Sequence, residues 1–184
     1  MKIYFHLNIL GFSNCYIVVD EKASDAIIID PGKITTNLIS QIEDNNLKLS
    51  AILITHNHGS HVQGLKTLQK IYFPKIYAAD WDVAQNETRV LTGDGKLRIG
   101  KMVVHYMTVP GHTADSVVYK IGNILFTGDT LSASNYGETN SSYSEYILKS
   151  NVDSKIFSQQ DITLVMPGHG PPTTLESLKK LLKY

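Results

Sequence analysis

The chain has 184 residues, 42% of them hydrophobic and 18% charged, a composition that indicates a globular protein and excludes a disordered or membrane-spanning one. Its 17 basic residues balance its 17 acidic residues, so no excess of positive charge indicates a nucleic-acid partner. The one cysteine, Cys15, excludes an internal disulfide. No low-complexity linker or block of charge divides the sequence, so we expect a single domain over residues 1–184. Because the N-terminus lacks a signal-peptide pattern, we expect a cytoplasmic location.

The first half of the chain predicts strands that alternate with helices. Short apolar runs predict strands near residues 2–7, 14–19, 26–30 and 51–55, and apolar residues at helical spacing predict helices over 35–46 and 60–72. Ser60 and Gln63 match a capping box, so we expect the second helix to begin at Ser60.

The second half predicts two strand pairs followed by helices. We expect strands over 97–109 and 117–129, interrupted by turns at Gly100 and Gly122, then a helix over 143–157, a strand over 162–166 and a helix over 174–184. Strands cluster in both halves, and helices close each half. The sequence therefore predicts an α+β fold in which sheets pack on each other with helices outside.

Potential metal ligands directly follow four of the predicted strands. "AILIT" leads into His56, "MTVPG" into His112, "NILFTG" into Asp129 and "TLVMPG" into His169. Loops at one edge of a sheet can converge on one cleft, and imidazole nitrogens with a carboxylate oxygen suit zinc, iron or manganese. The pattern therefore predicts a metal-binding cleft at the strand ends.

Three histidines lie close together in "THNHGSH". His56 and His58 cannot share one helix face, but from a loop both rings can face one ion. His61 begins the predicted helix and would face a second ion nearby. His6 and His105 lie inside strand patterns, and we interpret them as structural.

The segments "THNHGSH", "PGHT", "TGDT" and "PGHGP" resemble, in this order, the signature segments of the metallo-β-lactamase superfamily. The likeness is greatest to short hydrolases similar to glyoxalase II. The resemblance implies an αββα sandwich with the site at one edge of the sheets. It also implies a first metal on His56, His58 and His112, a bridging Asp129, and a second metal on His61 and His169.

Ser60 departs from the family pattern. The family has an aspartate directly before its third histidine, and that aspartate binds the second metal. A neutral hydroxyl is a poor ligand by comparison, and the missing charge leaves the repulsion between two cations less compensated. We therefore expect one tightly bound Zn²⁺ and a weaker second ion, although Fe²⁺ or Mn²⁺ also suits these ligands.

The loop after Asp129 departs from the family pattern as well. Where relatives often have Gly-Arg-(small)-Asp, this chain has "NYGETN", so that Glu138 replaces a basic residue and leaves substrate recognition open. Tyr136 and Ser60 are the candidate substrate contacts. Asp30 resembles a family position that supports the metal ligands, and an ordinary turn residue is the other interpretation.

These observations favour a metal-dependent hydrolase that acts on a small thioester or ester through an activated water. Asp129 and His61 are the candidate catalytic residues. One alternative is a mononuclear iron oxidoreductase similar to persulfide dioxygenases, with His56, His112 and Asp129 as ligands. Another is a non-catalytic metal-binding relative with an impaired second site. We expect a small-molecule substrate and neither nucleic acid nor membrane as partner; the oligomeric state stays open.

Overall fold

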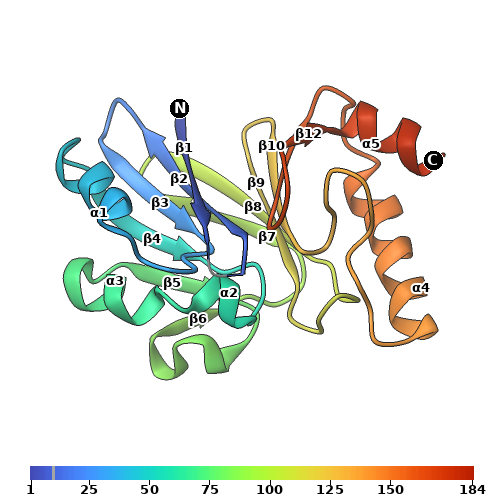
Figure 1. Cartoon of the computed structure of the whole chain (residues 1–184), viewed down its shortest axis with the longest axis horizontal. Helices are drawn as coiled ribbons and strands as arrows, with labels where there is room; N and C mark the ends of the chain where they lie inside the picture. Colours follow the sequence, from blue (N-terminus) through green and yellow to red (C-terminus); the bar gives the residue numbers. More distant parts are fainter. Residues whose placement is uncertain (10) are drawn as a thin grey trace.

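The computed structural model describes residues 1–9 and 11–184 and contains two six-stranded sheets with helices on their outer sides (Figure 1). The strand order is β1-β2-β3-β4-β5-β6 in the first sheet and β12-β11-β10-β9-β8-β7 in the second. Each sheet is thus built from one half of the chain. Within the described part, no helix is long and apolar enough to cross a membrane.

The first sheet begins antiparallel and continues parallel, since β1 to β3 pair antiparallel and β3 to β6 pair parallel. Its strands are β1 (Lys2–Asn8), β2 (Ser13–Asp20), β3 (Asp25–Ile29), β4 (Lys48–Leu53), β5 (Lys75–Ala78) and β6 (Thr88–Val90). The connections contain α1 (Thr36–Glu43), α2 (Gly59–Val62), α3 (Leu65–Tyr72) and the 3₁₀ turns η1 (Trp81–Val83) and η2 (Gln85–Glu87).

The second sheet is antiparallel except where β10 pairs with β11. Its strands are β7 (Gly95–Ile99), β8 (Met102–Thr108), β9 (Val117–Ile121), β10 (Ile124–Gly128), β11 (Leu164–Pro167) and β12 (Thr173–Thr174). Its helices are α4 (Ser142–Asn151), the π-helical turn η3 (Val152–Ile156) and α5 (Leu175–Leu182).

Apolar side chains form three layers of core. Tyr16, Tyr119 and Phe126 belong to the layer between the two sheets. Leu38 and Leu65 belong to the layer under α1 and α3, and a third layer lies under α4 and α5. The predicted α+β fold, an αββα four-layer sandwich, is therefore confirmed.

The predicted helix over 60–72 is two helices in the structure. The backbone N–H of Gly64 donates to Pro31 O at 2.9 Å instead of continuing the helix, so α2 and α3 separate there. His58 is the N-cap of α2, and Ser60 lies inside its first turn. The prediction that Ser60 caps this helix is therefore wrong.

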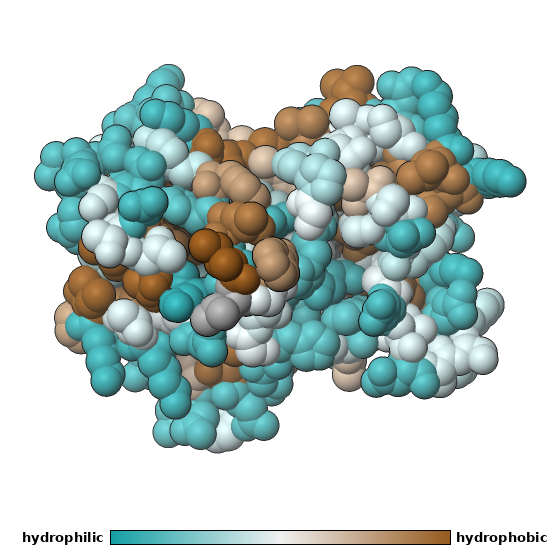
Figure 2. Space-filling model, viewed as in Figure 1, coloured by the Kyte–Doolittle hydropathy of each residue, from teal (hydrophilic) through white to brown (hydrophobic). Residues whose placement is uncertain are grey.

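The edge strand β1 carries exposed apolar side chains. Phe5 and Leu7 are about half exposed, and Ile9 follows them in the turn after the strand. Apolar side chains gather along this strand in Figure 2. The turn after β1 leads to Phe12, which contacts the candidate site described next.

Candidate metal centre

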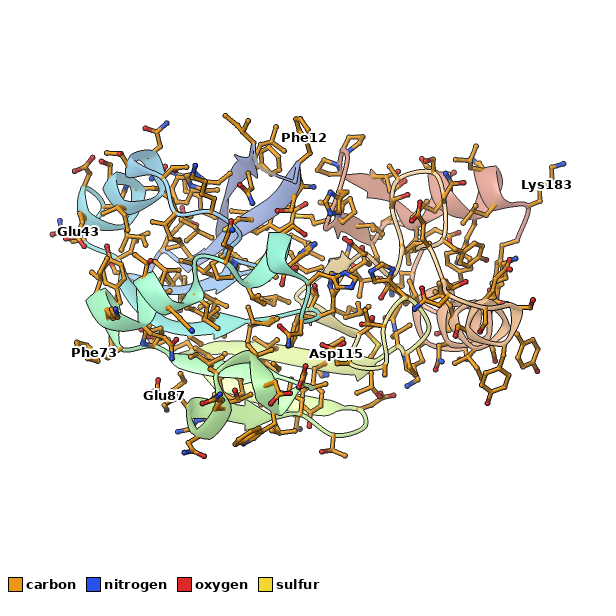
Figure 3. All side chains as sticks on the ribbon, turned by 60° about the horizontal axis from the view of Figure 1, so that its bottom comes forward. Phe12, Glu43, Phe73, Glu87, Asp115 and Lys183 are labelled. Atoms are coloured by element: carbon orange, nitrogen blue, oxygen red, sulfur yellow. The ribbon has the colours of Figure 1, made fainter. Side chains whose placement is uncertain are left out.

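Five of the six candidate ligands lie on loops and His61 lies in the short helix α2, and all of them meet where strands of both sheets end. His56, His58 and His61 follow β4, His112 follows β8, Asp129 follows β10 and His169 follows β11. Nitrogen-bearing rings gather in the middle of the molecule, between the labelled Phe12 and Asp115 (Figure 3). The structure thus brings together all six side chains that the sequence singled out.

The first group comprises His56, His58, His112 and Asp129, whose ligand atoms all lie within 4.8 Å of one another. His58 Nδ1 lies 2.9 Å from His56 Nε2 and 3.3 Å from His112 Nε2. Asp129 Oδ2 lies 3.7 Å from His56 Nε2 and 3.8 Å from His112 Nε2. Three imidazole nitrogens and one carboxylate oxygen around one point match the donor set of a tetrahedral zinc site.

The second group comprises His61, His169 and the same Asp129. His61 Nε2 lies 3.4 Å from Asp129 Oδ1, and His169 Nε2 lies 3.4 Å from Asp129 Oδ2. Within residues 1–9 and 11–184, the buried atoms His61 Nε2 and Asp129 Oδ1 have no hydrogen-bond partner. Since buried polar atoms are almost always paired, these two atoms fit a cation held by the second group.

Asp30 positions one ligand of each group. Its Oδ2 lies 3.0 Å from His61 Nδ1, and the same oxygen accepts a hydrogen bond from Thr55 Oγ1 at 2.6 Å. Thr55 Oγ1 in turn lies 3.1 Å from His56 Nδ1. Because the Nδ1 atoms of His56 and His61 are held in this way, their Nε2 atoms face Asp129. Metal-ligating histidines are commonly oriented like this, with the second ring nitrogen bound to a neighbouring group. The interpretation of Asp30 as an ordinary turn residue is therefore incomplete.

Backbone carbonyls orient the two histidines from the second half of the chain. His112 Nδ1 lies 2.8 Å from Glu138 O, and His169 Nδ1 lies 3.0 Å from Phe12 O. These contacts again leave Nε2 facing Asp129.

Two polar side chains of β2 hold the loop that carries His169. Asn14 Nδ2 donates to Pro167 O at 2.9 Å and to Gly170 O at 2.7 Å. Tyr16 donates to the same Pro167 carbonyl at 2.7 Å. Sequence reasoning missed this role, although a buried asparagine inside an apolar strand is a signal that could have indicated it.

Charge and burial shift the pKa values of His56, His61 and Asp129 in different directions. Burial, aided by the charge of His61, lowers the pKa of His56 to about 2. Burial also lowers the pKa of His61, but the carboxylates of Asp30 and Asp129 outweigh it and raise that pKa to about 10. For Asp129, burial raises the pKa, but contacts with His169 and His61 hold it well below its usual range. The site therefore presents an ionised carboxylate and a neutral His56, the forms that bind cations.

A cavity of about 410 Å³ opens beside the ligands. Its walls are formed by His112, Gly128, Asp129, Ser132, Asn135, Tyr136, Gly137, Glu138 and His169. Tyr136 thus lies where a substrate could contact it. Ser60 is not among these lining residues; its carbonyl accepts a hydrogen bond from Ser13 Oγ at 2.6 Å, and its Cβ faces Gly11.

Comparison with protein families and curated proteins identifies relatives of this chain. Residues 8–84 match the model of the metallo-β-lactamase superfamily. A probable polyketide biosynthesis zinc-dependent hydrolase of Bacillus velezensis is 36% identical over 64% of this chain and 54% of its own length. A hydroxyacylglutathione hydrolase of Nitrosomonas eutropha is 32% identical over 86% of this chain and 62% of its own length. The chain therefore spans between half and two thirds of these two relatives.

Other relatives match over nearly their whole length. An uncharacterized protein of Mycobacterium tuberculosis is 30% identical over 88% of both chains. The structure of ETHE1 from Myxococcus xanthus superimposes with a TM-score of 0.88 and 24% identity, over 98% of this chain and 83% of that one. A protein solved in a di-iron-bound form has a TM-score of 0.78 and 23% identity, over 96% of both chains. The structural matches show that the fold is shared.

Proposed function

The chain belongs to the metallo-β-lactamase superfamily, and from this premise we propose that it is a metal-dependent hydrolase of small thioesters or esters. The observation that carries the proposal is the pair of ligand groups that share Asp129 beside an open cavity. The names of two relatives, a zinc-dependent hydrolase and a hydroxyacylglutathione hydrolase, support it. The proposal treats residues 1–184 as one cytoplasmic domain with a small-molecule substrate.

The two ligand groups would hold ions of unequal affinity. We assign the tight Zn²⁺ to His56, His58, His112 and Asp129, which supply four ligand atoms. His61, His169 and Asp129 supply three, and Ser60 adds no carboxylate there. When bound, such an ion polarises a carbonyl group and lowers the pKa of a water molecule to near neutrality.

His61 and Asp129 are the proposed catalytic residues. Asp30 holds the His61 ring by Nδ1, so that Nε2 is directed at Asp129 Oδ1 and no other partner competes for it in the described residues. Asp129 Oδ1 can take up the proton of a water molecule as that water attacks the carbonyl carbon, and His61 Nε2 can orient the water. Tyr136 borders the cavity and is the proposed substrate contact.

A second candidate function is favoured by the position of Asp129 between two histidines. Asp129 Oδ2 lies 3.7 Å from His56 Nε2 and 3.8 Å from His112 Nε2, and two histidines with one carboxylate are the ligands of mononuclear iron oxygenases. Purified protein that contains iron and consumes oxygen with glutathione persulfide would favour this candidate over the hydrolase.

The experiment is a hydrolysis assay on zinc-loaded protein with acetyl thioesters, in which the released thiol is measured. We expect turnover that a chelator abolishes and added zinc restores. The His56→Ala and Asp129→Ala variants should lose at least about 100-fold in kcat/KM and most of their bound metal, because each removes a ligand.

His105→Ala is the matched control. His105 is an exposed histidine of β8 outside both ligand groups, so this variant should keep its metal and its activity. Equal metal content in all three variants would refute the ligand assignment. Protein that binds zinc and hydrolyses no thioester or ester would refute the hydrolase and favour a non-catalytic relative.

A further inference from the structure

The cavity beside the ligands has an acidic wall. Apart from Asp129 and the two histidines, Glu138 is its one titratable carboxylate, and no lysine or arginine lines it within residues 1–9 and 11–184. The charge that a substrate meets outside the ligand groups is therefore negative.

Glu138 is held at this place by its own backbone. Its carbonyl lies 2.8 Å from His112 Nδ1, so the residue is tied to a candidate ligand. Its side chain is exposed, and in the described part of the chain no basic side chain pairs with it. Glu138 is thus an uncompensated charge at the cavity.

A basic group close to Tyr136 is already paired. Lys149 of α4 lies 5.6 Å from the ring centre of Tyr136, but its Nζ forms a 2.6 Å ion pair with Glu145. Lys149 is not among the residues that line the cavity. It therefore does not reverse the negative charge of the wall.

Two further carboxylates lie beside His58. Asn57 donates from its backbone N to Asp115 Oδ2 and from Nδ2 to Asp80 Oδ2, both at 2.8 Å. Asp80 and Asp115 line a neighbouring cavity of about 520 Å³, and no lysine or arginine is among its described lining residues. Carboxylates thus lie beside His58 as well as at the wall of the first cavity.

We propose that Glu138 determines specificity by charge, so that the site prefers thioesters whose thiol portion is cationic and discriminates against those that carry a carboxylate. The inference rests on the proposed hydrolase function. A charge at a protein surface still acts over several ångströms, because the effective dielectric constant there is well below that of bulk water. A metal ion attracts anions equally in every variant, so a comparison of Glu138 variants isolates the contribution of this side chain.

The test uses acetyl thioesters of three short thiols that differ in charge: acetylthiocholine is cationic, S-acetyl-2-mercaptoethanol is neutral and S-acetyl-3-mercaptopropionate is anionic. The kcat/KM ratio is compared between variants, so that differences in intrinsic reactivity and size cancel. We expect zinc-loaded wild type to have about a tenfold higher kcat/KM for the cationic than for the anionic thioester. Glu138→Gln should reduce this ratio to about two, and Glu138→Lys should invert it. High salt should weaken the preference of the wild type.

The neutral thioester reports whether each variant keeps its fold and its activity. Glu43→Gln is the control, because Glu43 of α1 lies at one end of the molecule in Figure 3. This variant should leave the ratio of kcat/KM for the cationic and anionic thioesters unchanged. If neutral thioester is hydrolysed and the ratio is the same in wild type and in both Glu138 variants, the inference is wrong while the hydrolase stands. If zinc-loaded wild type hydrolyses none of the three, the proposed function fails and the inference fails with it.

Discussion

At the scale of single residues, the site depends on Asp30. This carboxylate lies against His61 and, through Thr55, against His56, so it orients one ligand of each group. It also has a φ of 51°, a left-handed conformation that asparagine tolerates as well as aspartate does. Replacement of Asp30 by asparagine therefore removes the charge and preserves the backbone.

We expect Asp30→Asn to weaken zinc binding by about 10-fold to 100-fold, the usual effect of losing the partner of a ligating histidine. Competition with a chromophoric chelator measures the affinity. Asp25→Asn is the control, because Asp25 begins the same strand that Asp30 follows and bonds to Ser50, away from the site. Equal affinities in the two variants would show that Asp30 does not position the ligands.

At the scale of elements, the break between α2 and α3 ends the short helix that carries His61. A Cβ on Gly64 would lie 2.5 Å from Ile34 Cδ1 and 2.8 Å from Gly32 O. Gly64→Ala therefore forces the loop at 31–34 away from the helices. We expect a loss of about 2 kcal/mol in the free energy of unfolding, measured by urea denaturation of metal-free protein.

Gly59→Ala is the matched variant within the same segment. A Cβ on Gly59 meets no atom within 4 Å, so this change should alter stability by less than about 0.5 kcal/mol. If the two substitutions cost the same, close packing at Gly64 is not what separates the helices.

The sequence predicted elements best where local patterns are strong. The strands that precede His56, His112, Asp129 and His169 can be predicted because each is an apolar run that stops shortly before a polar residue. The short strands β5 and β6 were missed because four and three residues give too little pattern. The predicted helix over 143–157 is α4 followed by the π-helical turn η3, a change of hydrogen bonding that apolar spacing does not reveal.

The candidate ligands could be predicted from short motifs, but the residues that hold these ligands in place could not. Asn14 holds the carbonyl of Pro167 across 153 positions of the sequence, and Phe12 reaches His169 across 157. Such contacts depend on how the two sheets pack. The capping role expected of Ser60 failed because α2 already begins at Gly59, with His58 as its N-cap, and ends before Gly64, whose N–H donates to Pro31 O.

At the scale of the whole molecule, the candidate ligands join the two halves of the fold. His56, His58 and His61 follow a strand of the first sheet, whereas His112, Asp129 and His169 follow strands of the second. An ion held by both sets links the sheets only in the folded chain. We expect zinc at 1,000 times its dissociation constant to raise the free energy of unfolding by about 4 kcal/mol.

The stabilisation by zinc should decrease as the pH falls. The carboxylates of Asp30 and Asp129 outweigh burial and raise the pKa of His61 to about 10, so metal-free protein keeps this imidazole protonated near neutral pH. A bound ion must displace that proton, and acid favours the proton. The shift in Tm caused by a fixed zinc concentration should therefore be smaller at pH 6 than at pH 8; a larger shift at pH 6 would contradict the assignment of His61.

The two sites of the binuclear-type centre should differ in affinity, because Ser60 stands where a carboxylate would bind the second ion. Ser60→Asp tests it directly. The residue lies in the first turn of α2, where an acidic side chain is favourable. Titration of metal-free protein with zinc should give about one tightly bound ion in wild type and about two in the variant. Two equally tight ions in wild type would contradict the account.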